Sequence, residues 1–373
     1  MNNLEENFDS ISPYADEEVS DVMKSLINDK KFHDSISAQI YPSIFKIIPG
    51  LSSFLFRKTF TKSFGNSKSI EQFQNNLAPF VEEMIKRTTD GFSYSGSENL
   101  SSLPTLYISN HRDIALDSLF LNFARFVEGK KTVRIAIGDN LLDSGFFEKL
   151  MRLNKSFVVH RNIKGAKETL IKLGNLSRYI SHSLTADQES IWIAQSEGRA
   201  TDGHDFTDPA VLKMLYLASR KTLEINEWVK QVNLTPVSIS YEYDPLDITK
   251  AIGREGWDEV SYEENNQRDL RELVKGIKEP KGRVHLHIGK NINEKIKNIK
   301  DLAKLIDSEI ITNYKLWPSN YISAYSLGLT SKTENFEGKK KSFLFRFKSL
   351  DETTRKKVLR MYSAPFQNQK KRG

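Results

Sequence analysis

The sequence predicts an α/β fold, in which helices flank a mostly parallel central sheet and a helical region precedes it. From residue 104 onward, short β-rich runs alternate with helical patterns, which is typical of parallel strands joined by helical crossovers. Before that point the apolar residues recur at helical spacing. With 373 residues, 38% hydrophobic and 28% charged, the chain has an ordinary globular composition and enough length for a sizeable core.

The N-terminal region, residues 1–95, is expected to be helical. Pro13 and the acidic run 16–18 fit a first helical turn, where carboxylates favour the positive end of the helix dipole. A second helix fits residues 69–86, whose apolar residues keep helical spacing: Ile70, Phe73, Leu77, Phe80 and Met84. Because Pro79 lies inside this pattern, a kink or a break is expected there.

Residues 96–330 carry the α/β pattern, which begins after the Gly- and Ser-rich stretch GFSYSGSENLSS. The predicted strands are 104–109, 132–137, 156–160, 190–194, 235–241 and 283–288. Helices are expected near 113–127, 165–184 and 209–231, the last with Asp208 as N-cap and Pro209 at the first helical position. The polar region 244–280 is expected to leave the sheet. A basic helical tail, residues 331–373, ends the chain.

Charge and cysteine usage narrow the classes of function. The 55 Lys and Arg against 48 Asp and Glu give a net charge of +7, but acids and bases are interspersed, so no nucleic-acid partner is expected. The chain has no cysteine, which excludes thiolate nucleophiles, zinc–thiolate sites and disulfides.

The N-terminal sequence also bears on the relation to membranes. It is acidic and lacks the basic start and apolar run of a signal peptide. The most apolar long segment is interrupted by Lys46, Pro42 and Pro49, so no spanning helix is expected. Residues 40–62 mix apolar and basic side chains as an interfacial helix would. A helix that packs on the rest of the protein fits the same pattern.

The first of four strand ends that carry reactive or ligand-binding side chains is the run SNHRDIALDS. Ligand sites of open α/β sheets form at the carboxyl ends of strands. His111 ends the strand 104–109, and Asp113 and Asp117 begin the next helix. An imidazole held by a carboxylate is a general base, and the start of the helix offers N–H donors to an oxyanion. Alternatively, His111 hydrogen-bonds in a turn and Asp113 is an N-cap.

Of the other three strand ends, two carry cationic side chains that could bind an anion, and one carries a proline. SFVVHRN ends in His160 and Arg161, which suit a phosphate or form a solvated strand end. SIWIAQSEGR ends in Glu197, Gly198 and Arg199, a turn in which glycine permits close approach and arginine offers a forked donor. TPVSISYE carries Pro236, which is otherwise an edge or strand-start proline.

Taken in this order, the four segments resemble the glycerolipid acyltransferase family, the glycerol-3-phosphate and 1-acyl-glycerol-3-phosphate acyltransferases. The blocks NHRDIALD, FVVHR, IAQSEGR and TPVSISYE carry the resemblance and cover roughly residues 104–242. With the later KLWPSNY they look like a bacterial subgroup. The resemblance implies a glycerol-3-phosphate acyltransferase-like fold for this part of the chain.

Two blocks depart from the family pattern. The family places Asp five positions after His, but residue 116 is Leu, so the choice lies between Asp117 and Asp113. Each helical residue turns a side chain by about 100°, and one more residue in the turn would restore the geometry for Asp117. We favour Asp117, because Asp113 has an alternative role as N-cap. The third block lacks the residue often found between Gly198 and Arg199, which affects the role of Arg199.

The resemblance implies acyl transfer from acyl-CoA or acyl carrier protein to the hydroxyl of 1-acyl-glycerol-3-phosphate in phospholipid synthesis. It implies that His111 is the general base and Asp117 its partner, without a covalent acyl-enzyme, a metal or another cofactor. Arg161 and Arg199 would hold the acceptor phosphate, and Glu197 would orient the acceptor or an arginine. Gly198 and Pro236 would complete the substrate site.

Other activities remain open at this point. Within the enzyme class they are glycerol-3-phosphate 1-O-acylation and acylation of another hydroxylated lipid. From a different class, a non-catalytic membrane-surface binding protein fits residues 40–62. The expected location is cytoplasmic, peripherally associated with the inner face of the cell membrane, whose anionic surface would be a partner.

Overall fold

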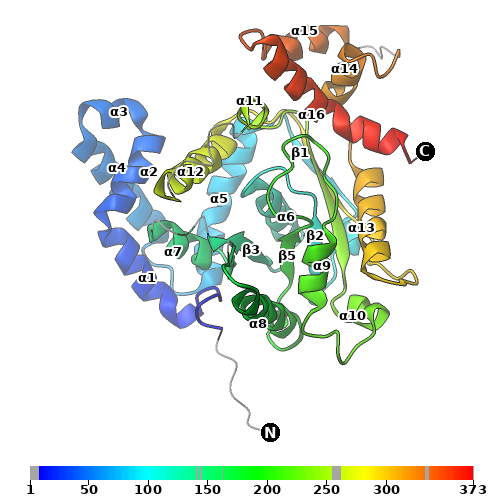
Figure 1. The fold of residues 1–373 in the computed structure, drawn as a ribbon. Coiled ribbons are helices and arrows are strands. Elements are labelled where there is room, and N and C mark those ends of the chain that lie inside the picture. The colour runs from blue at the N-terminus through cyan, green and yellow to red at the C-terminus, as the bar shows by residue number, and fades with distance from the viewer. Residues whose placement is uncertain are drawn as a thin grey trace. The chain divides into compact units, whose positions relative to one another are not determined.

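A computed structural model describes residues 8–139, 142, 145–161, 163–253, 262–331 and 336–372, without the side chains of 262–267, 270 and 337. The chain divides into two compact units, which are described separately (Figure 1). The first unit comprises Met1–Glu83 with Arg134–Gly165, and the second comprises Met84–Val133 with Ala166–Gly373.

The first unit is mainly helical. Its elements are α1 (Asp16–Asn28), α2 (Lys30–Ile40), α3 (Pro42–Ile47), α4 (Pro49–Phe64), most of α5 (Ile70–Thr88), β3 (Arg134–Gly138), α7 (Phe146–Leu153) and β4 (Ser156–Val159). The acidic run 16–18 occupies the first turn of α1, and α5 continues as one helix through Pro79. Phe32 packs against Phe56, Phe60 and Phe146, with ring centroids 5.0–5.4 Å apart. The strands β3 and β4 pair in parallel.

The second unit contains a sheet in the order β1-β7-β6-β2-β5, flanked by helices. Its strands are β1 (Phe92–Ser95), β2 (Leu106–Ser109), β5 (Ile191–Ala194), β6 (Thr235–Tyr241) and β7 (Val284–Ile288). All neighbouring pairs are parallel except β6 and β7. The mostly parallel sheet predicted from the sequence is therefore confirmed.

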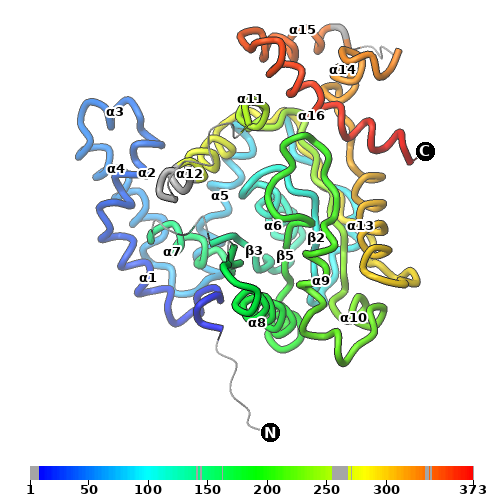
Figure 2. Tube along the Cα trace, in the orientation of Figure 1, coloured from blue at the N-terminus to red at the C-terminus, as the bar shows by residue number. Residues whose placement is uncertain are grey.

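The helices of the second unit follow the predicted alternation with strands. They are α6 (Leu116–Val127), α8 (Ala166–Thr185), α9 (Pro209–Tyr216), α10 (Ile225–Gln231), α11 (Asp247–Ile252), α12 (Tyr262–Lys278), α13 (Ile299–Asn313), α14 (Pro318–Ser326), α15 (Glu337–Phe345) and α16 (Glu352–Lys370). The excursion predicted for 244–280 holds α11 and α12, while its residues 254–261 lie outside the described part of the chain. The C-terminal α16 packs against α11, α13 and α14 (Figure 2).

Two elements differ from the sequence-based expectation. The Gly- and Ser-rich stretch contains β1, an edge strand in register with β7 through Phe92 opposite Val284. The single helix predicted for 209–231 is wrong, because α9 and α10 are separate. Between them the carbonyl of Ser219 accepts the N–H groups of Thr222 and Leu223 in a turn. Asp208 caps α9 as predicted, accepting from the N–H of Ala210 at 2.7 Å.

The sheet brings three loops together at one edge. Because β2 is parallel to both β5 and β6, all three strands run toward the same edge. β2 and β5 end level with each other, and β6 continues past them. Residues 110–115 and 195–205 therefore leave the sheet next to each other, beside the last residues of β6 and the loop 242–246 that follows it, at the edge where α/β proteins place their sites. No helix in the described ranges is both long enough and apolar enough to cross a membrane.

Candidate active site

The loop after β2 brings His111 and Asp117 together. The imidazole Nδ1 lies 3.0 Å from Oδ2 of Asp117. The His111 side chain is 11% exposed and that of Asp117 is fully buried. Residues 110–115 form an irregular turn and α6 begins at Leu116, so Asp117 is the second residue of the helix. This turn accommodates the additional residue of the His-x5-Asp spacing.

Asp117 accepts hydrogen bonds from four donors. Besides the imidazole, its Oδ2 accepts the backbone N–H groups of Arg112 at 2.7 Å and Asp113 at 2.9 Å. Its Oδ1 accepts the hydroxyl of Tyr241 at 2.7 Å. An ionised carboxylate only accepts hydrogen bonds. Because three donors other than the imidazole already point at Asp117, we assign the shared proton to Nδ1 of His111. The lone pair of the imidazole is then on Nε2.

Tyr241 is a fixed donor in this arrangement. It ends β6 and is buried beside α6. Burial, and then the negative charges of Asp117 and Asp113, raise the pKa of Tyr241 well above its ordinary value. The phenol therefore stays protonated and donates to Asp117 throughout the physiological pH range.

Asp113 contacts the start of α6, although the N-cap residue itself is Ala115 and not Asp113. Its Oδ1 accepts the N–H groups of Ala115 and Leu116, each at 3.0 Å, at the start of α6. Burial, and then the charge of Asp117, raise the pKa of Asp113. Of the two carboxylates, Asp117 contacts the imidazole, and Asp113 binds two N–H groups at the start of α6.

The same hydrogen bonds limit which N–H groups can serve the oxyanion. The sequence suggested that N–H groups at the start of α6 would face the reacting carbonyl. The N–H groups of residues 112 and 113 are bonded to Asp117, and those of 115 and 116 to Asp113. Those four donors are occupied, so they are not available to an oxyanion.

Further residues, which the sequence did not indicate, hold His111 in place. Its N–H donates to Oδ2 of Asp205 at 3.0 Å, and Oδ1 of Asp205 accepts from Gln195 at 3.0 Å. Its carbonyl accepts from the N–H of Ala200 at 3.1 Å. The Trp192 ring lies edge-on to the imidazole, with centroids 5.9 Å apart. No described residue hydrogen-bonds to Nε2 of His111.

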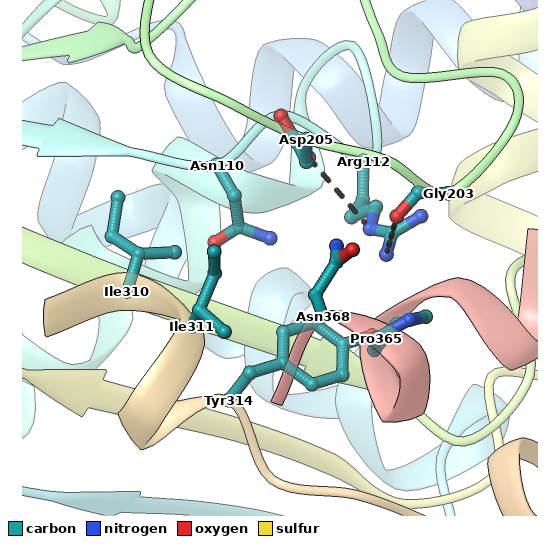
Figure 3. Close-up of a pocket in the computed structure, with 9 residues that line it drawn as sticks. All are labelled: Asn110, Arg112, Gly203, Asp205, Ile310, Ile311, Tyr314, Pro365 and Asn368. Atoms are coloured by element: carbon teal, nitrogen blue, oxygen red, sulfur yellow. Dashed lines mark hydrogen bonds and ion pairs between the residues drawn. The ribbon is translucent and has the colours of Figure 1, made fainter. Parts of the chain in front are cut away.

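Arg112 supports this loop from the interior. Its guanidinium lies 3.8 Å from the carboxylate of Asp205 and donates to the carbonyl of Gly203 at 3.3 Å. The ammonium of Lys250 donates to the carbonyl of Arg112 at 2.6 Å. A cavity of about 20 Å³, large enough for one water, is lined by Arg112, Tyr314 and two residues of α16, Pro365 and Asn368 (Figure 3).

The third block lies beside His111 through its backbone. Gly198 has φ +80°, a left-handed conformation that favours glycine. Arg199 follows and forms a short ion pair with Glu272 of α12. Glu197 is exposed. The N–H of Ala200 completes the link, since it donates to His111.

Arg161 and Pro236 occupy different places. Arg161 belongs to the first unit, where its N–H donates to Asp139 at 3.1 Å and His160 contacts the other carboxylate oxygen at 3.1 Å. Pro236 is the second residue of β6, opposite Ile108 of β2. It is a strand-start proline in an interior strand, level with the next-to-last residue of β2. Substrate contacts of both residues stay predictions.

The described ranges hold no group of three or more His, Cys, Asp or Glu side chains placed as metal ligands. The expectation that neither a metal nor another cofactor is required therefore rests on the sequence resemblance alone.

The comparison with protein-family models agrees with the position of this site. Residues 91–222 match the family model described as Acyltransferase. This segment includes His111, Asp117 and Arg199, and the match confirms the acyltransferase resemblance carried by the motifs. No curated protein matches the chain. Among solved structures, the 1-acyl-sn-glycerophosphate (LPA) acyltransferase PlsC from Thermotoga maritima is 12% identical, with 75% of this chain and 95% of that chain covered and a TM-score of 0.37.

Proposed function

We propose that this acyltransferase moves a fatty acyl group from a thioester to the hydroxyl of 1-acyl-glycerol-3-phosphate, with His111 as the general base. The observation that carries the proposal is the His111–Asp117 pair, held at 3.0 Å inside the matched segment 91–222. The four donors on Asp117 fix the imidazole with its lone pair on Nε2. This is the protonation state that a general base requires.

The reaction follows from that state. Nε2 of His111 takes the proton of the acceptor hydroxyl while the hydroxyl oxygen attacks the thioester carbonyl carbon. Asp117 stabilises the imidazolium that forms. The C–S bond then breaks, the new ester remains, and the leaving thiolate takes the proton from Nε2. Direct attack agrees with a chain that has no cysteine to carry the acyl group.

Arg199 is proposed to bind the phosphate of the acceptor. Its side chain is 13% exposed, and the next residue, Ala200, is hydrogen-bonded to His111. A guanidinium provides two parallel donors to a phosphate. Arg161 is proposed as a further substrate-binding residue, and Glu197 as a group that orients the acceptor or an arginine. The donor is proposed to be acyl-CoA or acyl carrier protein.

Residues of α3 and α4 are proposed to contact an anionic membrane surface at the inner face of the cell membrane. Ile47 is 79% exposed, Ile48 53% and Phe54 60%. Exposed basic side chains accompany them: Lys46, Arg57, Lys58 and Lys62. The opposite face of α4 packs inward through Phe56, Phe60 and Phe64. Exposed apolar side chains among cations fit an interfacial helix.

The test offers the purified chain a labelled acyl donor with several acceptors in separate reactions. The expected product is phosphatidate from 1-acyl-glycerol-3-phosphate. Greater turnover of glycerol-3-phosphate would identify a 1-O-acyltransferase instead, and that of an uncharged lipid alcohol would contradict a phosphate-bearing acceptor. Binding to anionic vesicles without any acyl transfer would indicate the non-catalytic alternative. Parallel reactions with acyl-CoA and acyl carrier protein identify the donor.

A further inference from the structure

Two arginines from separate elements hold one buried carboxylate beside the site. Arg199 follows β5 and contacts Oε2 of Glu272, and Arg268 donates from Nε to Oε1 of Glu272 at 2.7 Å. The exposed fractions of these side chains are 13% for Arg199, 17% for Arg268 and 7% for Glu272. Arg268 and Glu272 are one helical turn apart in α12, so both face the loop that carries Arg199.

The charge of this carboxylate is maintained by the arginines. Burial alone would raise the pKa of Glu272, but Arg199 and Arg268 more than compensate and the pKa is lowered. Glu272 is therefore an anion between two guanidinium groups. Each of its oxygens is bonded to a different arginine, an arrangement that also suits two oxygens of a phosphate.

Arg199 keeps donor capacity beyond this ion pair. Its Nη1 is buried, and no hydrogen-bond partner for it is found among the described residues. A phosphate monoester carries a third oxygen and a larger charge than a carboxylate. A phosphate in the position of the Glu272 carboxylate would use the donors that Glu272 uses and offers an acceptor to Nη1 as well.

We propose that Glu272 occupies the acceptor's phosphate site and leaves it when the acceptor binds, and that Arg268 is a second phosphate-binding residue beside Arg199. This inference rests on the proposed function and adds to it. Glu272 competes with any phosphate monoester, whether a lipid or a soluble glycerol phosphate. It raises the concentration of acceptor that is needed and favours acceptors with two negative charges over those with one.

The test compares Glu272→Gln with Glu279→Gln, an exposed position just after α12 that undergoes the same change of charge. Binding of glycerol-3-phosphate and of 1-acyl-glycerol-3-phosphate is measured by calorimetry without an acyl donor. We expect Glu272→Gln to bind about tenfold more tightly than the wild type. This is the gain expected if Glu272 blocks about nine-tenths of the phosphate sites in the wild type. Glu279→Gln should bind as the wild type does. Both esters should gain alike, and the ester that binds more tightly identifies the preferred acceptor.

A second variant and a kinetic measurement distinguish two roles of Glu272, competition with the phosphate and structural support of Arg199. Glu272→Asp keeps the charge but withdraws the carboxylate, and should tighten binding to a smaller extent. Arg268→Gln should weaken binding and raise KM for the phosphorylated acceptor, without changing KM for a monoacylglycerol. Unchanged or weaker binding by a folded Glu272→Gln or Glu272→Asp chain would overturn the inference. Because binding needs no turnover, this failure is distinct from a failure to transfer acyl groups.

Discussion

At the scale of single residues, Asp117 organises the site. It is fully buried and joins three parts of the chain: the imidazole of His111, two backbone N–H groups of the loop, and the hydroxyl of Tyr241 from β6. Because this side chain is surrounded by hydrogen-bond donors, an isosteric amide would bring a further donor among them. The substitution therefore changes both the tautomer of His111 and the conformation of the loop.

Asp117→Asn should therefore lose acyl transfer by about 10²–10⁴-fold in kcat, the range of a general base whose orientation and tautomer are lost. Asp113→Asn should lose far less, because Asn caps a helix as well as Asp does. Turnover of the two variants is compared in one assay, with circular dichroism to check folding. A greater loss in Asp113→Asn would reverse the assignment of the two carboxylates.

Tyr241→Phe removes one hydroxyl and keeps the aromatic packing beside Phe120. Oδ1 of Asp117 is then buried without its donor, which should cost about 1–3 kcal/mol of unfolding free energy. Denaturant titration of the two proteins measures this difference, and kcat should decline with it. A variant as stable as the wild type would mean that this hydrogen bond is not needed to hold Asp117.

The sequence predicted these residues unequally. His111, Asp113 and Asp117 lie in one short run, where the strand end, the helix start and the known geometry of a His–carboxylate pair were all visible. Asp205 and Gln195 sit in or before a polar loop whose path is set by tertiary contacts, so nothing local marked them. Tyr241 lay at the end of the block TPVSISYE, and its position at a strand end was the available signal.

At the scale of elements, the pairing of β1 with β7 explains why β1 was missed. The residues FSYS alternate aromatic and serine side chains, but the run is only four residues long and lies in a Gly- and Ser-rich stretch that is typical of a loop. Side chains of the partner strand hold this edge in place. His285 of β7 hydrogen-bonds to Ser93 at 2.9 Å and to Ser95 at 3.0 Å, both on β1.

This pairing should depend on pH. Burial, followed by the charges of Lys315 and His287, lowers the pKa of His285 from 6.5 to about 4. Between these values the unfolded chain binds the proton and the folded chain does not, so the contribution to stability is complete above pH 6.5 and is lost as the pH falls toward 4. The wild-type Tm should decrease more than that of His285→Gln from pH 7 to 4.5. Parallel decreases would exclude His285 as the cause.

The helices show the same division between local and tertiary control. Asp208 and Pro209 mark the start of α9 in the sequence, and the structure begins the helix at Pro209. The break between α9 and α10 has no comparable local signal, because Tyr216 and Trp228 pack across it with ring centroids 5.2 Å apart. Continuous apolar spacing therefore predicted one helix where tertiary packing produces two.

At the scale of the whole molecule, the two units carry different parts of the proposed activity. The segment 91–222, which matches the Acyltransferase family model and contains His111 and Asp117, belongs largely to the second unit. The helices α3 and α4 belong to the first unit. Composition and net charge predicted neither assignment, since the basic residues are spread along the chain. Local patterns of apolar and basic residues were more informative than the total of +7.

Membrane contact through α3 and α4 has its own test. Ile47→Asp combined with Phe54→Asp should weaken binding to vesicles that contain anionic phospholipid by about tenfold or more, because two exposed apolar side chains are lost. Flotation measures the bound fraction. Lys46→Ala should weaken binding to a smaller extent and only to anionic vesicles. Thr59→Asp, at an exposed position of α4, adds one negative charge without removing an apolar side chain, and an equal loss there would contradict apolar contact.

The most direct test of the central claim, that His111 is the general base of an acyl transfer, is the single-turnover rate of His111→Ala with labelled acyl donor and 1-acyl-glycerol-3-phosphate. The account predicts a folded protein, with wild-type circular dichroism, whose rate of transfer to the hydroxyl falls by about 10²–10⁴-fold. A rate equal to that of the wild type would contradict it.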